Sequence, residues 1–308
     1  MQLGYGKLIL FGEHFVVYGL PGIASAIGLY TRCRLYPNEK GITVNDRLTN
    51  KHILVGKGNS DILEQTMQII LKETALEKKN FRLEIDGNIP IFGGLGSSAA
   101  LIVSIARELN REFLLNLSDK KINEIAFKAE HVFHSAPSGI DNTVSTFGGL
   151  VWFEKNLHGG KNKMEQLKMK KPLLVVIGNT RIIHDTGEAV KFVRAQKEKQ
   201  PKKFEQIFGQ AKELAHEAKK ELIAGNGKKV GELLNKNQGL LKQVGVSSKE
   251  LELLCETALG AGALGAKLTG AGMGGCMFAL AKNAEQQKKI AREFEKEGFG
   301  SYITKVGV

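Results

Sequence analysis

The sequence predicts an α+β fold, because strand-like and helical segments are mixed without the strict alternation of a doubly wound parallel sheet. The 308 residues are 42% apolar and 25% charged, which is enough apolar material for one large or two ordinary domains. A polar, lysine-rich stretch at Gly159–Lys171 predicts a domain boundary. The expected domains are residues 1–168 and 169–308.

The first half is expected to begin mainly as strands and turns and to continue as helices. Its candidate strands are Leu8–Phe11, Tyr30–Tyr36, His52–Val55, Phe81–Ile85 and Leu150–Phe153. Its candidate helices are Ser60–Thr74, the apolar run Ala99–Leu109, and a segment from Ser118 to about Phe133. Ser135–Gly149 is expected to be a loop and a helix start.

The second half reads as amphipathic helices between buried strands. Its candidate strands are Pro172–Ile177, Cys276–Ala281 and Ser301–Val306. Its candidate helices are Gly187–Gln196, Lys203–Ala224, Val230–Gln243, Ser248–Leu259 and Glu285–Glu297.

The strongest local feature is the run Pro90–Ala100, PIFGGLGSSAA. Its glycines let the backbone approach an anion closely, and the helix that follows offers free N–H groups and a favourable dipole to phosphate. Ser97 and Ser98 add hydroxyls for phosphate or Mg²⁺. The run is not a Walker A loop, since no Gly-Lys-Ser/Thr follows. A structural helix with a flexible entry is the alternative.

A second glycine-rich loop, Lys267–Gly275, has four glycines in six positions. Such density is costly in backbone entropy and indicates that something approaches the backbone. A tight strand-to-strand turn is the alternative, although it needs fewer glycines.

Both loops also match dinucleotide-binding patterns, Gly270/Gly272/Gly275 as GxGxxG and Gly94/Gly96/Ala99 as GxGxxA, with Asp119 downstream. Their contexts fail. An apolar strand follows the first where a helix is required, and Asn88-Ile-Pro separates the second from its strand. A dehydrogenase is therefore a weak alternative.

Two further segments carry polar groups suited to phosphoryl transfer. In the run Glu130–Asp141, one carboxylate could hold Mg²⁺ and the other could accept a substrate proton. A surface glutamate and a capping aspartate would look the same. In the run Lys7–His14, polar groups bracket a buried strand and suggest one site seen from both ends, although a lone histidine is more often structural.

Composition bounds the remaining function classes. The net charge of +12 admits nucleic-acid binding, but the Lys-rich segments have few aromatic or Arg partners, so a solvated basic surface is favoured. Three scattered cysteines indicate neither a disulfide framework nor a zinc site. No apolar run is long enough for a membrane span, and the N-terminus does not resemble a signal peptide, so a cytoplasmic protein is expected.

In their order along the chain, these segments resemble the GHMP superfamily of small-molecule kinases. The chain is most similar to the mevalonate kinases, through GEHFVVYG at Gly12–Gly19 and PSGIDNTVSTFGG at Pro137–Gly149. The resemblance implies a two-domain fold, with an N-terminal mixed sheet and helices, a C-terminal α/β domain and the active site in the cleft between them. It also implies transfer of the ATP γ-phosphate to the 5-hydroxyl of mevalonate.

The resemblance implies a role for each matched residue. Asp141 would be the general base with Lys7 beside it, and Ser98 and Glu130 would ligate Mg²⁺. The implied ATP-binding residues are Pro90, Gly93, Gly94, Leu95, Gly96, Ser97, Ser98 and Ala99. The implied mevalonate-site residues are Glu13, His14, Thr186, Gly270, Ala271 and Gly272, with His14 a partner for the carboxylate.

The expected partners are therefore mevalonate and ATP with Mg²⁺, with no nucleic acid and no membrane. The oligomeric state stays open, with a homodimer as one possibility. One departure concerns the segment before Thr186: animal mevalonate kinases have Arg-Asn-Thr where this chain has His184-Asp185-Thr186. Substrate contacts there, and feedback inhibition by isoprenoid diphosphates, stay open. An inactive binding module is the remaining alternative, and retention of Lys7, Ser98, Glu130 and Asp141 argues against it.

Overall fold

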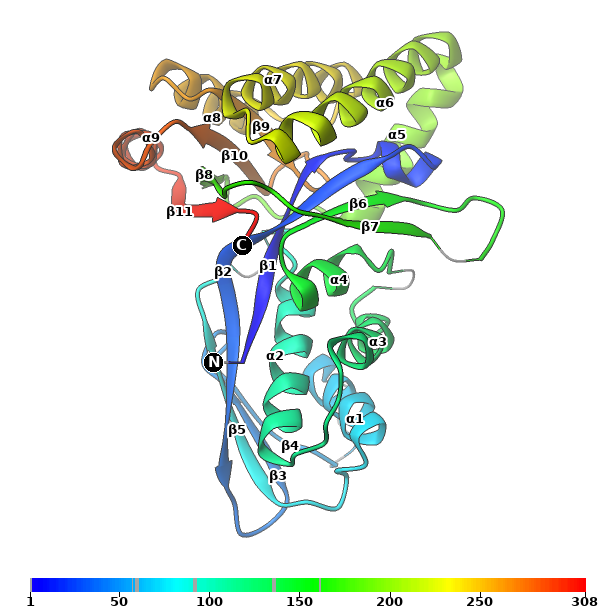
Figure 1. Cartoon of the computed structure of the whole chain (residues 1–308), viewed down its shortest axis with the longest axis vertical. Helices are drawn as coiled ribbons and strands as arrows, with labels where there is room; N and C mark the ends of the chain where they lie inside the picture. Colours follow the sequence, from blue (N-terminus) through cyan, green and yellow to red (C-terminus); the bar gives the residue numbers. More distant parts are fainter. Residues whose placement is uncertain (1, 57, 59–60, 91–92, 135–136, 161) are drawn as a thin grey trace. The chain divides into compact units, whose positions relative to one another are not determined.

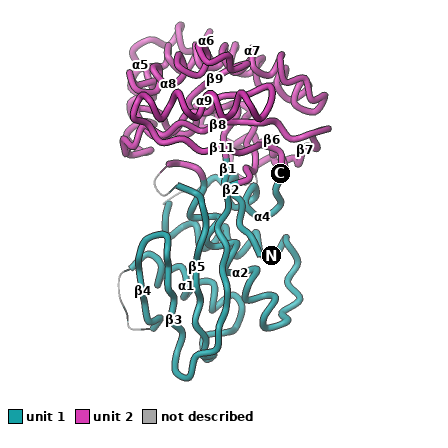
Figure 2. Tube along the Cα trace, turned by 90° about the vertical axis from the view of Figure 1, so that its left-hand side faces the viewer, with its two compact units in different colours: residues 1–7, 29–91, 96–148 teal, residues 8–28, 92–95, 149–308 magenta. Residues whose placement is uncertain are grey.

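A computed structural model describes residues 2–56, 58, 61–90, 93–134, 137–160 and 162–308. These residues form eleven β-strands, nine α-helices and one short 3-10 helix, which confirms the predicted α+β class (Figure 1). The chain divides into two compact units (Figure 2). Unit 1 comprises residues 1–7, 29–91 and 96–148, and unit 2 comprises residues 8–28, 92–95 and 149–308. The domain boundary expected after residue 168 lies within unit 2 and stays a prediction, because compactness and sequence domains are different measures.

Unit 1 contains a mixed sheet. Its strands are β3 (Ile42–Asp46), β4 (Lys51–Leu54), β5 (Phe81–Gly87) and the unit 1 parts of β1 (Leu3–Phe11) and β2 (Gly22–Pro37). Strand β5 pairs antiparallel with β2, from Thr31↔Gly87 to Pro37↔Phe81, and parallel with β3. Strand β4 then pairs antiparallel with β3. The parallel and antiparallel pairs together make this sheet mixed, as expected.

Four helices complete unit 1: α1 (Ile62–Thr74), α2 (Ser97–Glu112), α3 (Asp119–Glu130) and α4 (Ile140–Phe147). Helices α1, α2 and α3 share one apolar core with the sheet, in which Val44, Leu83 and Ile105 are fully buried. The Asp61 and Ser118 side chains cap α1 and α3 by accepting backbone N–H bonds. This packing fixes the start of α2 and the end of α3, where the candidate site residues lie.

Unit 2 is built on antiparallel strands. They are β6 (Leu150–Glu154), β7 (Lys163–Leu167), β8 (Leu173–Asn179), β9 (Gly265–Thr269), β10 (Cys276–Ala281) and β11 (Gly300–Val306). Four of them run in the order β11-β8-β10-β9. Strand β6 pairs with β7 and with the first residues of β2.

The helices of unit 2 are α5 (Thr186–Lys199), α6 (Pro201–Ala224), α7 (Gly227–Val244), α8 (Lys249–Gly260) and α9 (Ala284–Lys296), with η1 at Phe15–Tyr18. Helices α7 and α8 pack on β9, and α9 packs on β8 and β11. None of the helices formed by the described residues is long and apolar enough to cross a membrane.

The structure contains strands that hydrophobic patterns do not reveal. Strand β7 lies in the stretch interpreted as a polar boundary, and four of its five residues are exposed, so only its backbone pairing with β6 marks it as a strand. Strand β1 extends N-terminally to Leu3 through a glycine-rich start. Gly4 is needed there, since a Cβ would lie 1.9 Å from the backbone oxygen of Ala100 in α2. Close backbone approach explains why the second residue of this strand is a glycine rather than a β-branched residue.

Candidate active site

Lys7 and Asp141 form an ion pair within unit 1, although 134 positions separate them in the sequence. The Lys7 Nζ lies 3.0 Å from the Asp141 Oδ1. Lys7 comes from β1 and is buried, while Asp141 lies in the first turn of α4 with 28% of its side chain exposed. A partly accessible carboxylate next to a buried ammonium can accept a proton from an alcohol while the cation attracts the alcohol oxygen.

Glu130, the last residue of α3, lies near this pair and is buried. Burial, and secondly the Asp141 carboxylate, raise the pKa of Glu130 to about 7, while a hydrogen bond from Ser98 and the Lys7 charge oppose the shift. Its Oε1 is buried and accepts no hydrogen bond from any residue that the structure describes. An unsatisfied buried carboxylate oxygen is costly unless a cation or donor supplies the missing partner.

Glu130 and Ser98 together fit a magnesium ion. Both present oxygen, the donor that Mg²⁺ prefers, and proteins commonly hold Mg²⁺ with one or two side chains plus water and substrate phosphates. Within the described ranges no group of three or more His, Cys, Asp and Glu side chains is arranged to hold a metal.

The glycines of the first loop predicted that a helix follows them, and α2 begins at Ser97, two residues before the expected start at Ala99. Gly96 is the N-cap of α2 with φ of 73°, and no described side chain caps this helix end. A Cβ on Gly96 would lie 3.2 Å from the Lys7 Cβ, so the glycine also allows Lys7 to lie beside the helix start. The uncapped N–H groups of α2 are available to an anion.

The remainder of the loop divides between the units. Gly93, Gly94 and Leu95 belong to unit 2, and Leu95 is buried. Gly94 has φ of 68° and open space around the position of a Cβ. Residues 91 and 92 of the predicted phosphate loop lie outside the described residues. The ATP-binding roles expected for this loop, including those of Pro90 and Ala99, stay predictions.

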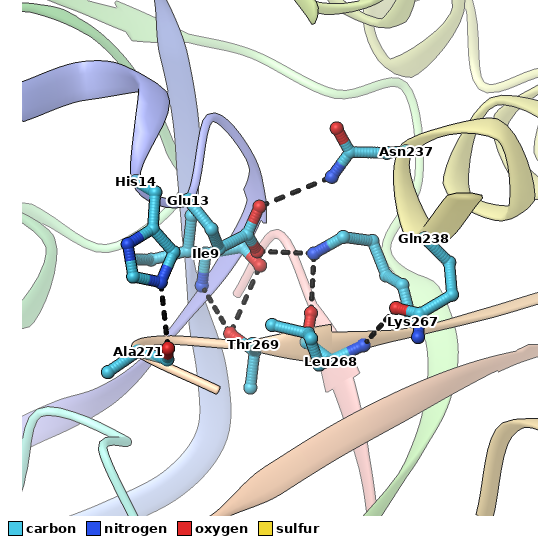
Figure 3. A network of polar contacts seen from close by, with 9 residues as sticks. All are labelled: Ile9, Glu13, His14, Asn237, Gln238, Lys267, Leu268, Thr269 and Ala271. Carbon is cyan, nitrogen blue, oxygen red and sulfur yellow. Dashed lines mark hydrogen bonds and ion pairs between the residues drawn. The ribbon is translucent and has the colours of Figure 1, made fainter. Parts of the chain in front are cut away.

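A second polar cluster lies within unit 2 (Figure 3). The Lys267 ammonium, from β9, donates to the Glu13 Oε1 and to the Leu268 carbonyl oxygen at 2.6 Å. The Glu13 Oε2 accepts from the Asn237 Nδ2 of α7 at 3.3 Å. Neither side chain of the ion pair is exposed. Burial raises the pKa of Glu13 and lowers that of Lys267, and each opposes the shift of the other.

His14 follows Glu13 with a positive φ of 58° and a ψ of −35°. Its Nε2 lies 2.7 Å from the Ala271 carbonyl oxygen, which can only accept, so Nε2 carries the proton. Burial lowers the pKa of His14, which keeps the ring neutral and leaves a lone pair on Nδ1. That atom is buried without a partner among the described residues. A neutral acceptor suits a substrate hydroxyl better than the carboxylate expected from the sequence.

Ala271 belongs to the second glycine loop, which joins β9 to β10 in the register Cys276↔Thr269. The loop is therefore a strand-to-strand connection. The local geometry nevertheless differs from one glycine to the next. Gly272 has φ of 72°, and a Cβ there would lie 2.2 Å from the Val246 carbonyl oxygen. Gly270 has φ of 82° and open space around the position of a Cβ. The loop thus combines a close backbone contact on one side with free space on the other.

Thr186 is exposed and opens α5, with Asp185 as the N-cap. The segment before it lies against the second glycine loop, since the Gly275 N–H donates to the Ile182 carbonyl at 2.8 Å. The sequence-predicted residues therefore form two groups. Lys7, Gly96, Ser98, Glu130 and Asp141 lie in unit 1. Glu13, His14, Thr186 and the second glycine loop lie in unit 2.

Sequence reasoning missed Lys267 and Asn237. The signal for Lys267 is that it is the one charged residue in the otherwise uncharged run GALGAKLTG. A lysine buried in such a strand needs a charged or polar partner from elsewhere in the chain. Asn237 gives no such signal, because it lies among polar residues of an amphipathic helix.

Two family models match the chain. The model described as GHMP kinases N terminal domain covers residues 61–149, and that described as GHMP kinases C terminal covers residues 218–300. The mevalonate kinase of Pyrococcus horikoshii is 38% identical over 97% of this chain and 93% of its own length. That of Thermococcus gammatolerans is 35% identical over 97% and 94%.

Solved structures of mevalonate kinases are also similar to this chain. The structure of L. major mevalonate kinase in complex with R-mevalonate matches with a TM-score of 0.90 and 33% identity, over 99% of this chain and 95% of that one. The Methanococcus jannaschii mevalonate kinase matches with a TM-score of 0.86 and 26% identity, over 99% and 97%. Sequence and backbone similarity therefore extend over nearly the whole chain.

Proposed function

The chain belongs to the mevalonate kinase family of the GHMP kinases, and from this premise we propose that it phosphorylates mevalonate. The reaction transfers the γ-phosphate of ATP to the 5-hydroxyl of mevalonate and gives 5-phosphomevalonate and ADP. The observation that carries the proposal is the ion pair of Lys7 with the partly exposed Asp141, beside the buried Glu130. This is the arrangement that an alcohol needs in order to attack a phosphoryl group.

Asp141 accepts the proton of the 5-hydroxyl as the new O–P bond forms. Lys7 donates a hydrogen bond to the hydroxyl oxygen and attracts the negative charge that develops on it. The start of α2 binds the phosphates of ATP through the N–H groups of Ser97 and its neighbours, because no described side chain caps that helix end. Phosphoryl transfer leaves the protein mainly these tasks of positioning and charge stabilisation.

Mg²⁺ would be held by Ser98 and Glu130, and the Glu130 Oε1 is the oxygen that lacks a partner among the described residues. When bound, the ion would compensate the charge of the ATP phosphate oxygens. Glu130 itself supplies a carboxylate whose pKa of about 7 leaves it easily ionised when a cation approaches.

Mevalonate is proposed to contact His14, Thr186 and the second glycine loop at Gly270, Ala271 and Gly272. The lone pair on the His14 Nδ1 and the open space at Gly270 support this assignment. The enzyme is proposed to work in the cytoplasm, which the three buried, unpaired cysteines support. The homodimer stays a prediction, which sedimentation measurements would test.

The test is an ADP-release assay of the purified protein with mevalonate, phosphomevalonate, homoserine and galactose, each with Mg²⁺ and ATP. We expect mevalonate to have the highest kcat/KM. Faster turnover of phosphomevalonate or homoserine would refute the substrate assignment and leave the family membership unchanged.

A further inference from the structure

Lys267 is a fully buried lysine in a strand whose five residues are all buried. Its ammonium contacts the Glu13 carboxylate and the Leu268 carbonyl, and it lies 5.3 Å from the centre of the Phe278 ring. A buried charge needs such partners. Replacing both members of a buried ion pair by well-packed apolar residues is often neutral or stabilising. Fold stability alone therefore does not require a lysine at this position.

The carboxylate of Glu13 is turned inward. One oxygen accepts from Lys267 and the other from Asn237, and the side chain has no exposed surface. Figure 3 shows these bonds on one side of the turn and the His14 ring on the other. Both oxygens of Glu13 therefore already have protein partners, which come from β9 and α7.

The turn at Glu13 and His14 needs to be held. His14 has a positive φ, which a non-glycine residue adopts at a cost. Such a conformation persists only when the surroundings fix it. Here the fixed neighbours are the Glu13 side chain before it and the buried Phe15 after it. The consequence of the turn is that His14 reaches Ala271 with Nε2 and keeps Nδ1 unoccupied by any described residue.

We propose that Lys267 is a positioning residue that acts through Glu13, holding His14 so that its Nδ1 accepts a hydrogen bond from a hydroxyl of the substrate. The proposal rests on the proposed function, since it concerns how the same alcohol substrate is recognised. It assigns Glu13 to the support of the site and His14 to contact with the substrate. Lys267 and Glu13 themselves touch neither substrate nor nucleotide.

The test uses Lys267→Met, Glu13→Gln and the double variant that carries both. Each single variant leaves one buried group without its partner and is expected to lose stability. The double variant removes both charges and is expected to regain much of that loss. Lys242→Met is the matched control, because Lys242 also pairs with a glutamate of unit 2, Glu252, but is 63% exposed.

We expect the double variant to raise the KM for mevalonate about 10- to 100-fold, the scale for a misplaced binding group, while the KM for ATP changes less than about twofold. The ¹⁵N spectrum of His14 should show the Nε2–H tautomer in the wild type and a changed signal in the double variant. The Lys242→Met control should match the wild type in both measurements.

If the Lys267–Glu13 pair had a purely structural role, the KM for mevalonate would change only in variants that also lose thermal stability. A double variant with a wild-type KM and a wild-type His14 spectrum would therefore overturn the proposal. So would a double variant that does not fold, since the pair would then serve folding. If the wild type fails to phosphorylate mevalonate, the proposed function fails, and the His14 spectra still decide whether Lys267 holds the ring.

Discussion

Replacing Asp141 by asparagine removes the proton acceptor while leaving the size of the side chain nearly unchanged. The amide keeps the shape of the side chain and can hydrogen-bond, but it lacks the basic lone pair that takes the hydroxyl proton. We expect kcat to fall by about 10²–10⁴. At about 1.4 kcal/mol for each factor of ten, this is about 3–6 kcal/mol of lost transition-state stabilisation. The KM for ATP should change little, because α2 and its glycine loop remain.

The same substitution also lowers the free energy of unfolding, and the size of this loss can be bounded from the ion pair. Lys7 is 7% exposed and would lose a carboxylate 3.0 Å from its ammonium. Removing one partner of a fully buried pair costs about 3–5 kcal/mol. Asp141 is 28% exposed, so solvent reduces the loss to about 1–3 kcal/mol. This is less than the stability of an ordinary domain, so the variant should fold and its kinetics can be interpreted.

The assay is ADP release at saturating mevalonate and ATP, with urea unfolding as the check on folding. Asp119→Asn is the matched control, since Asp119 also lies in the first turn of a helix of unit 1 and pairs with Arg107 at 3.1 Å. The control should keep wild-type turnover. Near-normal turnover of Asp141→Asn would refute the assignment of the base, and an equal loss in the control would show that the effect is not specific.

The remaining predictions concern the metal, a glycine, a histidine and the surface charge. Glu130→Gln should raise the Mg²⁺ concentration for half-maximal activity at least about tenfold, measured by titrating Mg²⁺ at fixed ATP. Gly272→Ala should cost about 2–4 kcal/mol in urea unfolding, because a Cβ would clash with Val246, and Gly270→Ala, with open space, should cost about 1 kcal/mol. His14 has a lowered pKa, so its contribution to stability is full above its unfolded-state pKa of about 6.5 and is lost as pH falls through the lower folded value. Wild-type stability should therefore fall more steeply than that of His14→Gln on acidification, as urea unfolding at a series of pH values would show. Binding to nucleic acid should be weak and vanish at moderate salt in a filter-binding titration, whereas sequence-selective binding at physiological salt would contradict a solvated basic surface.

Local sequence was sufficient where short-range chemistry sets the structure. The glycines of the first loop predicted that a helix follows them, and the structure places Gly96 at the N-cap of α2 in the left-handed conformation that favours glycine. Ser118 predicted the start of α3, and its hydroxyl caps that helix. Each of these features depends on a few adjacent residues. Neither required knowledge of what packs against the helix.

Partners that are distant in the sequence could not be predicted from spacing. The pairing of Lys7 with Asp141 was expected only through a family resemblance, because nothing in either segment specifies the other. Strand β7 was missed for a related reason, since its side chains are mostly exposed and only the backbone of β6 makes it a strand. Exposed strands of this kind carry lysine and other polar residues that protect sheet edges, which gives them the composition of a loop.

Lys267 shows where sequence reasoning about a site stops. Its neighbours in the sequence are apolar, and its partner Glu13 lies 254 positions away. From the sequence alone, Glu13 is equally compatible with contact to a substrate and with burial against a cation, since both uses need an ionised carboxylate beside Gly12 and His14. Only the inward direction of the carboxylate, with both oxygens bonded to β9 and α7, separates these roles. Hence a polar residue within a family motif identifies a functional region, and the direction of its side chain decides whether it binds the substrate or positions the residue that does.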